Sequence, residues 1–185
     1  MNRVFIVAVP DEVEIQGKIL ESPVIFSGVG KINAAMAAWN AFSQGYNEVI
    51  NIGSCGSLKT PVGTLVKVGQ VFQDIDATPL SEYGITPFEA AGKQILLDVN
   101  SSIKMFLQLI IFMTQNQILK YSHYYLDNIK KNDIFDMECF AIAKVCKRFN
   151  IKFSSYKWIS DDGDPHTWKD NCKLGFDKLK KLLNE

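Results

Sequence analysis

The chain has 185 residues, enough for one domain with a substantial core and too few for two ordinary domains, so we predict a single domain over residues 1–185. Twenty lysines and arginines balance twenty aspartates and glutamates, which argues against the strongly basic surface that binds nucleic acids or anionic membranes. With 47% hydrophobic residues, the composition also excludes a disordered chain.

Neither the N-terminus nor the cysteines predict export. The apolar run at residues 4–9 is short and leads directly into Pro10 and two acids, so it predicts a first strand and not a signal peptide. No stretch approaches the roughly 20 apolar residues of a membrane helix. Four cysteines occur without CxxC pairs or nearby histidines, so the sequence indicates neither a zinc site nor a disulfide framework. We expect a reduced, cytoplasmic protein without a metal.

The first half of the chain alternates short apolar runs with segments of helical pattern, which is typical of an α/β fold with a largely parallel sheet. The expected elements are a strand at 3–9, a helix at 10–20, a strand at 23–27, a helix at 31–42 and a strand at 48–52. The helix at 10–20 is expected because Pro10 suits a first helical position and Asp11 and Glu12 suit the positive end of the helix dipole.

The second half continues the same alternation. We expect strands at 64–72, 95–99, 104–113 and 151–159, helices at 137–149 and 167–183, and a long loop at 76–92. The helix at 137–149 is predicted from its apolar spacing, with Asp136 as its N-cap.

A glycine motif follows the strand at 23–27. The segment from Gly28 to Lys31 has the flexibility of a phosphate-binding loop, but it fails both standard patterns. Ile32 stands where a Walker loop has serine or threonine, and Asn33 stands where the dinucleotide fingerprint has its third glycine. Taken alone, the motif indicates a structural turn between strand and helix.

Three acids, Glu12, Glu138 and Asp161, lie just beyond expected strands or in the first turn of helices, at the sheet edge where α/β proteins bind ligands. Their convergence suggests a reaction driven by carboxylates. Each also has a structural explanation, because Glu12 and Glu138 complement helix dipoles and Asp161 begins an acidic turn that ends at Asp164. That turn lacks the spacing of a calcium-binding loop.

In order along the chain, four segments resemble the nucleoside phosphorylase and nucleosidase superfamily, and within it the 5′-methylthioadenosine/S-adenosylhomocysteine nucleosidases. They are residues 9–13, residues 27–35, residues 51–56, and the pair Asp136-Met137-Glu138 with Ile159-Ser160-Asp161. The resemblance covers most of the chain. It implies a three-layer αβα phosphorylase/hydrolase-like fold around a mixed, mostly parallel twisted sheet, and a homodimer.

The resemblance also implies a reaction, the hydrolysis of the N-glycosidic bond of a purine nucleoside. The sugar then passes through an oxocarbenium-like state, so the base must be protonated and a water activated on the opposite face. Asp161 would be the general acid to purine N7, steadied by Ser160, and Glu12 would activate the water. No metal or cofactor is implied.

The remaining site residues are also assigned by resemblance. Glu138 would hold the ribose hydroxyls and Met137 would pack under the sugar. Val29 would face the 5′ substituent. The other expected substrate-binding positions are Ser54, Cys55, Gly56 and Lys157.

Two alternatives remain open. A purine nucleoside phosphorylase would hold phosphate with arginines, and this chain has only Arg3 and Arg148, neither in a phosphate motif of the family. A catalytically impaired nucleoside-binding relative is favoured by Lys157, where the family usually has arginine, and by residues 105–125, which depart from the family pattern. The family's hairpin before Gly28 is also expected to be missing.

Overall fold

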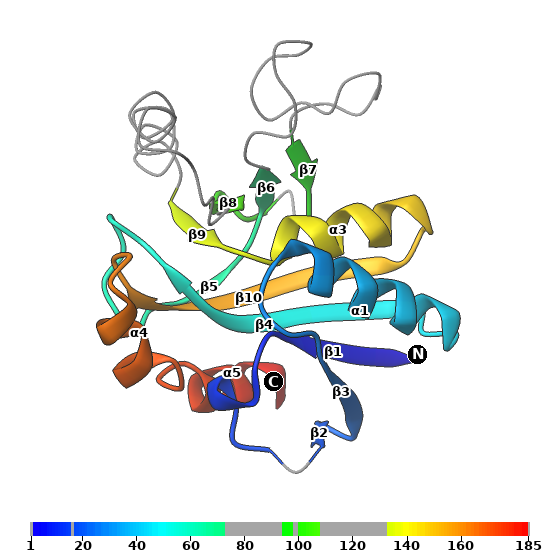
Figure 1. Cartoon of the computed structure of the whole chain (residues 1–185), viewed down its shortest axis with the longest axis horizontal. Helices are drawn as coiled ribbons and strands as arrows, with labels where there is room; N and C mark the ends of the chain where they lie inside the picture. Colours follow the sequence, from blue (N-terminus) through cyan, green and yellow to red (C-terminus); the bar gives the residue numbers. More distant parts are fainter. Residues whose placement is uncertain (1, 16, 73–93, 98–99, 108–132, 185) are drawn as a thin grey trace.

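The computed structural model describes residues 2–15, 17–72, 94–97, 100–107 and 133–184. Within these ranges ten strands form one mixed sheet of order β2-β3-β1-β4-β9-β8-β6-β7, with β10 paired to both β4 and β5 (Figure 1). The strands are β1 (Arg3–Val7), β2 (Lys18–Ile19), β3 (Ser22–Phe26), β4 (Glu48–Gly56), β5 (Leu65–Lys67), β6 (Gln70–Phe72), β7 (Gln94–Leu96), β8 (Lys104–Leu107), β9 (Ile134–Asp136) and β10 (Lys152–Asp161).

The centre of the sheet is parallel, since β3, β1, β4 and β10 all run in one direction. Helices α1 (Lys31–Ser43) and α3 (Cys139–Arg148) cover one face, and α4 (Pro165–Asn171) and α5 (Phe176–Asn184) lie on the other (Figure 1). The expected three-layer αβα fold is confirmed. No helix within the described ranges is long and apolar enough to span a membrane.

The side chains of β1 point alternately to the two faces of the sheet, and they contribute to the hydrophobic core beneath each helical layer. Val4 and Ile6 pack in a cluster with the buried alanines of α1, whereas Phe5 and Val7 pack in a cluster with Phe176 of α5. Successive side chains of a strand point to opposite faces, so a continuous apolar run is what a strand covered on both sides requires.

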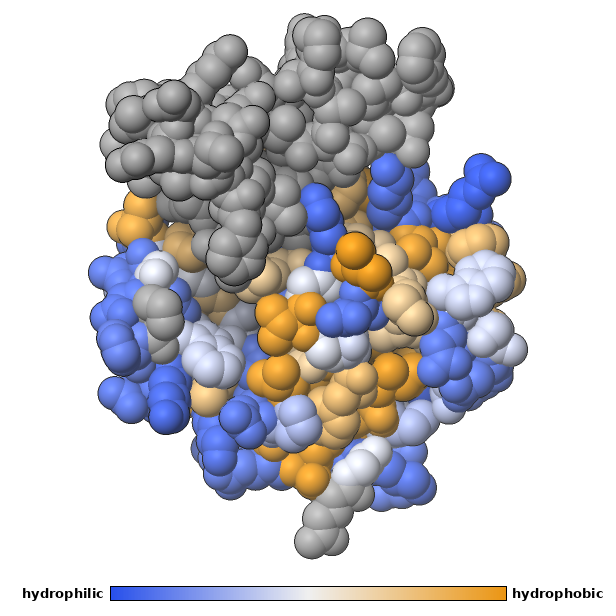
Figure 2. Space-filling model, in the orientation of Figure 1, coloured by the Kyte–Doolittle hydropathy of each residue, from blue (hydrophilic) through white to orange (hydrophobic). Residues whose placement is uncertain are grey.

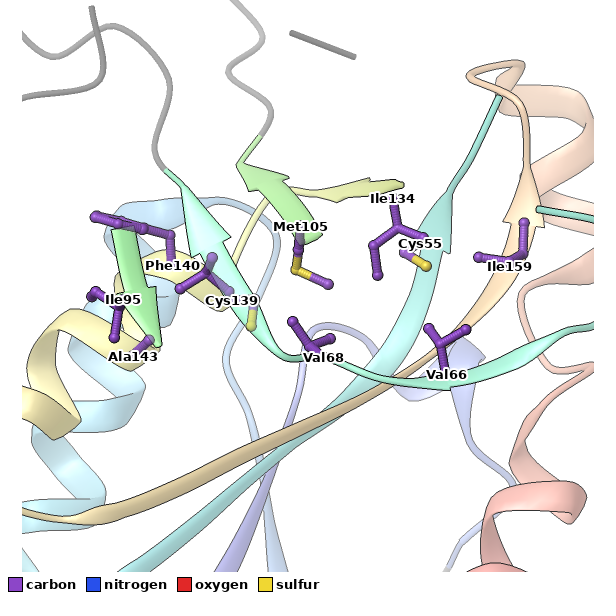
Figure 3. Packing of buried hydrophobic residues seen from close by; sticks show 11 residues of the cluster. Cys55, Val66, Val68, Ile95, Met105, Ile134, Cys139, Phe140, Ala143 and Ile159 are labelled. Carbon is purple, nitrogen blue, oxygen red and sulfur yellow. The ribbon is translucent and has the colours of Figure 1, made fainter. Parts of the chain in front are cut away.

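A third cluster fills the other end of the sheet. Cys55, Ile134, Met105, Val68 and Phe140 are among the residues that connect the end of β4 with β8, β9 and α3 (Figure 3). This packing fixes the strand β9, which ends at Asp136 and is followed directly by Met137 and Glu138. The strand β9 was not among the expected elements.

The expected helix at 10–20 is wrong. Among the described residues of this range, only Pro10–Glu12 is helical, as a single 3-10 turn, and the chain is extended again at Val13. Val13 and Ile19 are buried in the cluster that contains Phe5, and β2 pairs with β3 in an antiparallel hairpin. The hairpin before Gly28, expected to be missing, is therefore present in a short form.

Other boundaries also differ. The strand β4 continues through Gly56, and the expected strand at 64–72 divides into β5 and β6. The expected helix at 167–183 divides into α4 and α5. Between them, Gly175 lies so close to Trp158 that an added Cβ would be 2.2 Å from the Trp158 side chain. Three of the expected features lie wholly or partly outside the described residues. They are the loop at 76–92, the part of the strand at 104–113 beyond residue 107, and most of the divergent segment at 105–125.

Candidate active site

The central parallel strands end at one edge of the sheet, and a pocket of about 310 Å³ lies there. This volume is at the lower end of the range typical of small-molecule sites. Of the residues singled out from the sequence, those that line the pocket are Glu12, Val29, Ser54, Cys55, Gly56, Met137, Glu138 and Asp161. Ser160 and Lys157 are not among the residues that line it, and both are buried.

Glu12 reaches the pocket from the 3-10 turn that follows β1. Its Oε1 accepts hydrogen bonds from the backbone N–H of Ser54, at 2.7 Å, and from the Ser54 hydroxyl, at 2.5 Å. Gly53 makes this approach possible, because a Cβ at that position would lie 2.9 Å from Glu12 Oε1. Its φ of 154° is also one that side-chain-bearing residues rarely adopt.

The second carboxylate oxygen of Glu12, Oε2, is buried and has no hydrogen-bond partner among the described residues. Burial raises the pKa of Glu12 above its usual value, although Lys157 and the hydrogen bonds from Ser54 oppose the shift. A buried carboxyl with a free acceptor and a raised pKa is a suitable general base.

Asp161, the last residue of β10, is fixed by two neighbours. Its Oδ2 lies 2.6 Å from the Ser160 hydroxyl, and its Oδ1 accepts a hydrogen bond from the backbone N–H of Gly163 at 2.8 Å. The Asn171 side chain of α4 donates to the carbonyl of Ser160 at 3.0 Å. The carboxyl is therefore held at the pocket wall from both sides of the turn.

Glu138 immediately precedes α3 and points to a different helix. Its Oε1 accepts a hydrogen bond of 2.7 Å from the backbone N–H of Gly30, at the positive end of α1. Burial raises the pKa of Glu138 to about 7, with a further contribution from the negative charge of Asp136. The Gly28–Gly30 turn thus binds a carboxylate of the chain itself.

Lys157 is 2% exposed and lies behind the pocket, with its Nζ 2.9 Å from Asp136 Oδ2. Burial opposes the positive charge of Lys157, but the carboxylates of Asp136 and Glu138 outweigh it and raise the lysine pKa. Asp136 also accepts a hydrogen bond from the backbone N–H of Cys139, the first residue of α3. The expected N-cap is therefore wrong, because α3 begins at Cys139 and Glu138 occupies the N-cap position, although the Asp136 carboxylate still accepts the first helical N–H.

Two aromatic residues of the pocket were missed in the sequence. Phe135 of β9 lies against Gly56, where a Cβ would come within 2.1 Å of its ring. Trp168 of α4 lines the pocket, and its indole N–H donates to the Ser54 hydroxyl oxygen at 2.9 Å. No spacing rule identifies either residue, because both reach the site through tertiary packing.

The cysteines do not provide a nucleophile. All four are free and buried, and burial raises the pKa of the Cys55 and Cys139 thiols, which keeps them protonated. Within the described ranges, no group of three or more histidines, cysteines and acids is arranged to hold a metal ion.

An open, mostly parallel sheet between two helical layers, with an acid-lined pocket at the strand ends, defines an α/β protein with a small-molecule site. The sequence model of the phosphorylase superfamily matches residues 14–184, and the chain belongs to this family. The resemblance inferred from the sequence motifs is thus confirmed.

Among curated proteins, the chain is similar to the 5′-methylthioadenosine/S-adenosylhomocysteine nucleosidase of Buchnera aphidicola, with 28% identity over 86% of this chain and 77% of that one. The nucleosidase of Oceanobacillus iheyensis is also 28% identical, over 75% of this chain and 67% of that one.

Solved structures share the fold. The futalosine hydrolase of Helicobacter pylori superposes with a TM-score of 0.76 at 16% identity, covering 99% of this chain and 96% of that one. The 5′-methylthioadenosine/S-adenosylhomocysteine nucleosidase of Colwellia psychrerythraea, solved in complex with adenine, superposes with a TM-score of 0.71 at 22% identity, covering 94% and 88%.

The buried ion pair gives a prediction about stability. Replacing Lys157 by methionine leaves Asp136 without its cation, and we expect the free energy of unfolding to fall by about 3–5 kcal/mol in urea denaturation. The control is Lys152→Met in the same strand. Lys152 is 59% exposed and pairs with Glu48 at 2.7 Å, so its loss should cost less than about 1 kcal/mol. Equal losses in the two variants would contradict a special role for the buried pair.

The raised pKa values of Glu12 and Glu138 predict a decrease of stability with pH. The folded protein retains protons that the unfolded chain releases near the usual value of 4.5, so stability falls as the pH rises from there to about 7. Glu138→Gln should remove the part of this decrease that Glu138 causes, at most roughly 3 kcal/mol of the free energy of unfolding, measured by urea denaturation at pH 5 and pH 8.

Glu48 provides the control for this titration, since it is buried and ion pairs lower its pKa, the opposite shift. Glu48→Gln should therefore leave the slope between pH 5 and pH 8 intact. A slope that Glu138→Gln leaves unchanged would refute the assignment.

Proposed function

We propose that this chain hydrolyses the N-glycosidic bond of a purine nucleoside of the 5′-methylthioadenosine/S-adenosylhomocysteine type. The observation that carries the proposal is the presence of Glu12, Glu138 and Asp161 in one pocket, although they are far apart in sequence. The related nucleosidases support the same reaction class.

The two ends of the reaction need different acids. Asp161 is the proposed general acid that protonates N7 of the purine, which makes the base a better leaving group, and Ser160 steadies it. Glu12 is the proposed base that activates water on the opposite face of the sugar, and its unpartnered Oε2 is an acceptor for that water. Glu138 is proposed to bind the ribose hydroxyls.

Pocket-lining residues complete the proposed substrate site. Met137 is proposed to pack under the sugar, Val29 to face the 5′ substituent, and Ser54 and Gly56 to line the floor, with Cys55 as a further substrate-binding residue; all five line the pocket. Lys157 contributes indirectly in this proposal, through the carboxylates that it neutralises.

Hydrolysis is favoured over phosphorolysis by the positions of the two arginines. Arg3 pairs with Glu48 at 2.7 Å, where β1 and β4 begin, at the opposite end of the strands from the pocket. Arg148 is in the last turn of α3, at the opposite end of the helix from its N-cap Glu138, which lines the pocket. Neither arginine is placed to supply the guanidinium fork that suits a phosphate ion.

We also propose that the chain forms a homodimer through α1. Ile32 and Met36, one turn apart on this helix, are 74% and 66% exposed, and Val29, Trp39 and Phe26 add exposed apolar surface beside them. Figure 2 shows hydrophobic residues in the middle of the face that α1 crosses. Apolar surface gathered in this way is typical of an interface, and a second copy of the chain would cover it.

The catalytic proposal predicts that the protein releases free base without phosphate. The assay measures base released from methylthioadenosine, S-adenosylhomocysteine, adenosine and inosine, with and without phosphate. Asp161→Asn should lower kcat by about 10²–10⁴-fold, because the leaving base loses its proton donor.

Asp162→Asn is the matched control, since Asp162 is adjacent, exposed and outside the pocket. Full activity in Asp161→Asn would refute the general acid. Release that requires phosphate would indicate a phosphorylase, and nucleoside binding without release would indicate an impaired relative.

The dimer proposal predicts that Met36→Lys dissociates the protein, because a charge would be buried at the interface. Sedimentation velocity should show a dimer for the unmodified chain and a monomer for the variant. Leu182→Lys, on the exposed side of α5, should leave the dimer intact. A monomer in the unmodified chain would exclude the proposed interface.

A further inference from the structure

Trp168 and Glu12 are connected through one hydroxyl group. The indole N–H of Trp168 can only donate a hydrogen bond, so the Ser54 oxygen, 2.9 Å away, must be the acceptor. The single proton of Ser54 is then directed to Glu12 Oε1, at 2.5 Å. Trp168 therefore decides which way the serine donates.

This arrangement makes the two oxygens of Glu12 different. Oε1 receives both the hydroxyl and the backbone N–H of Ser54, whereas Oε2 has no partner among the described residues. One oxygen thus fixes the carboxyl, and the other remains as an acceptor in a buried setting.

The helix α4 that carries Trp168 is attached at both ends. The Asp164 carboxylate accepts hydrogen bonds from the backbone N–H of His166 and the hydroxyl of Thr167, which caps the helix start. At its end, Asn171 donates to the carbonyl of Ser160, next to Asp161. The indole is therefore held in place by the same helix that supports the Asp161 turn.

We propose that Trp168 is a positioning residue, which orients the Ser54 hydroxyl so that Glu12 Oε1 is saturated and Oε2 is left to accept a proton from the attacking water. This inference rests on the proposed function of Glu12. Trp168 acts through Ser54 in this scheme and needs no direct contact with the reacting atoms.

Other ionisable groups also act on Glu12. Lys157 of β10 favours its ionised form, and Glu138 at the start of α3 disfavours it. The thiols of Cys55 and Cys172 lie close enough to interact with its charge. These groups stay in place in Trp168→Phe, so the variant isolates the hydrogen bond.

The test is Trp168→Phe, which keeps an aromatic ring and removes the N–H. We expect kcat to fall about fivefold or more with little change in KM, and the acid limb of the kcat/KM profile to move about 0.5–1 unit toward higher pH. Trp158→Phe is the matched control, because it removes a buried indole N–H that donates to the Cys172 carbonyl, at 2.8 Å. That variant should lose stability without moving the acid limb.

A double-mutant cycle separates positioning from direct substrate contact. Ser54→Ala should show the same shift, and adding Trp168→Phe to it should cost little more. Independent losses that add, or a change confined to KM, would overturn the proposal.

A titration that needs no turnover distinguishes the positioning role of Trp168 from the proposed hydrolysis. Carbon-13 NMR of the Glu12 carboxyl, assigned with Glu12→Gln, should show a higher midpoint in Trp168→Phe than in the unmodified protein. A higher midpoint in a protein that releases no base would support the positioning and refute the proposed hydrolysis. An unchanged midpoint would refute the positioning, even in an active enzyme.

Discussion

The buried ion pair between Lys157 and Asp136 is the interaction on which the site depends. Glu12, Asp136 and Glu138 are all buried at one edge of the sheet, and such a group of carboxylates is costly unless a cation compensates it. Register in the sheet places the cation, because Lys157 of β10 is opposite Gly53 of β4. Gly53 in turn has no side chain, which lets the Glu12 carboxylate approach from the pocket side.

The same compensation allows the acids to differ from one another. Asp136 forms the direct ion pair with Lys157, whereas Glu12 and Glu138 interact with the lysine charge at longer range. Burial raises the pKa of Glu12 and of Glu138. Glu138 is further bound by the N–H at the start of α1, and its pKa of about 7 puts both its protonation states within reach near neutral pH. Glu12 and Glu138 therefore differ in their hydrogen-bond partners, since Ser54 donates to Glu12 and the backbone N–H of Gly30 donates to Glu138.

The sequence was informative where function depends on strand ends. Glu12 was correctly expected at the sheet edge although its helix was wrong, because a residue just after β1 lies at that edge whether a helix or a 3-10 turn follows. Lys157 was expected at the substrate, and only the pairing of β10 shows that it lies behind the pocket. The alternation of side chains along this strand could not reveal it from the sequence, because the pairing register of β10 with β4 shifts between Ile159 and Asp161.

Tertiary packing accounts for what the sequence could not supply. Trp168 reaches Ser54 across more than a hundred residues of chain, and it can do so only because α4 turns back over the end of β10. The short helix α4 therefore contacts Ser54, which binds Glu12, and Ser160, which binds Asp161.

The carboxyls of the two proposed catalytic acids differ in their hydrogen bonds. Asp161 accepts hydrogen bonds at both of its oxygens, whereas Glu12 accepts them at only one, so the two carboxyls present unequal acceptors to the pocket. A free acceptor suits the group that removes a proton from water, whereas the two accepted hydrogen bonds fix the position of the Asp161 carboxyl at the pocket wall.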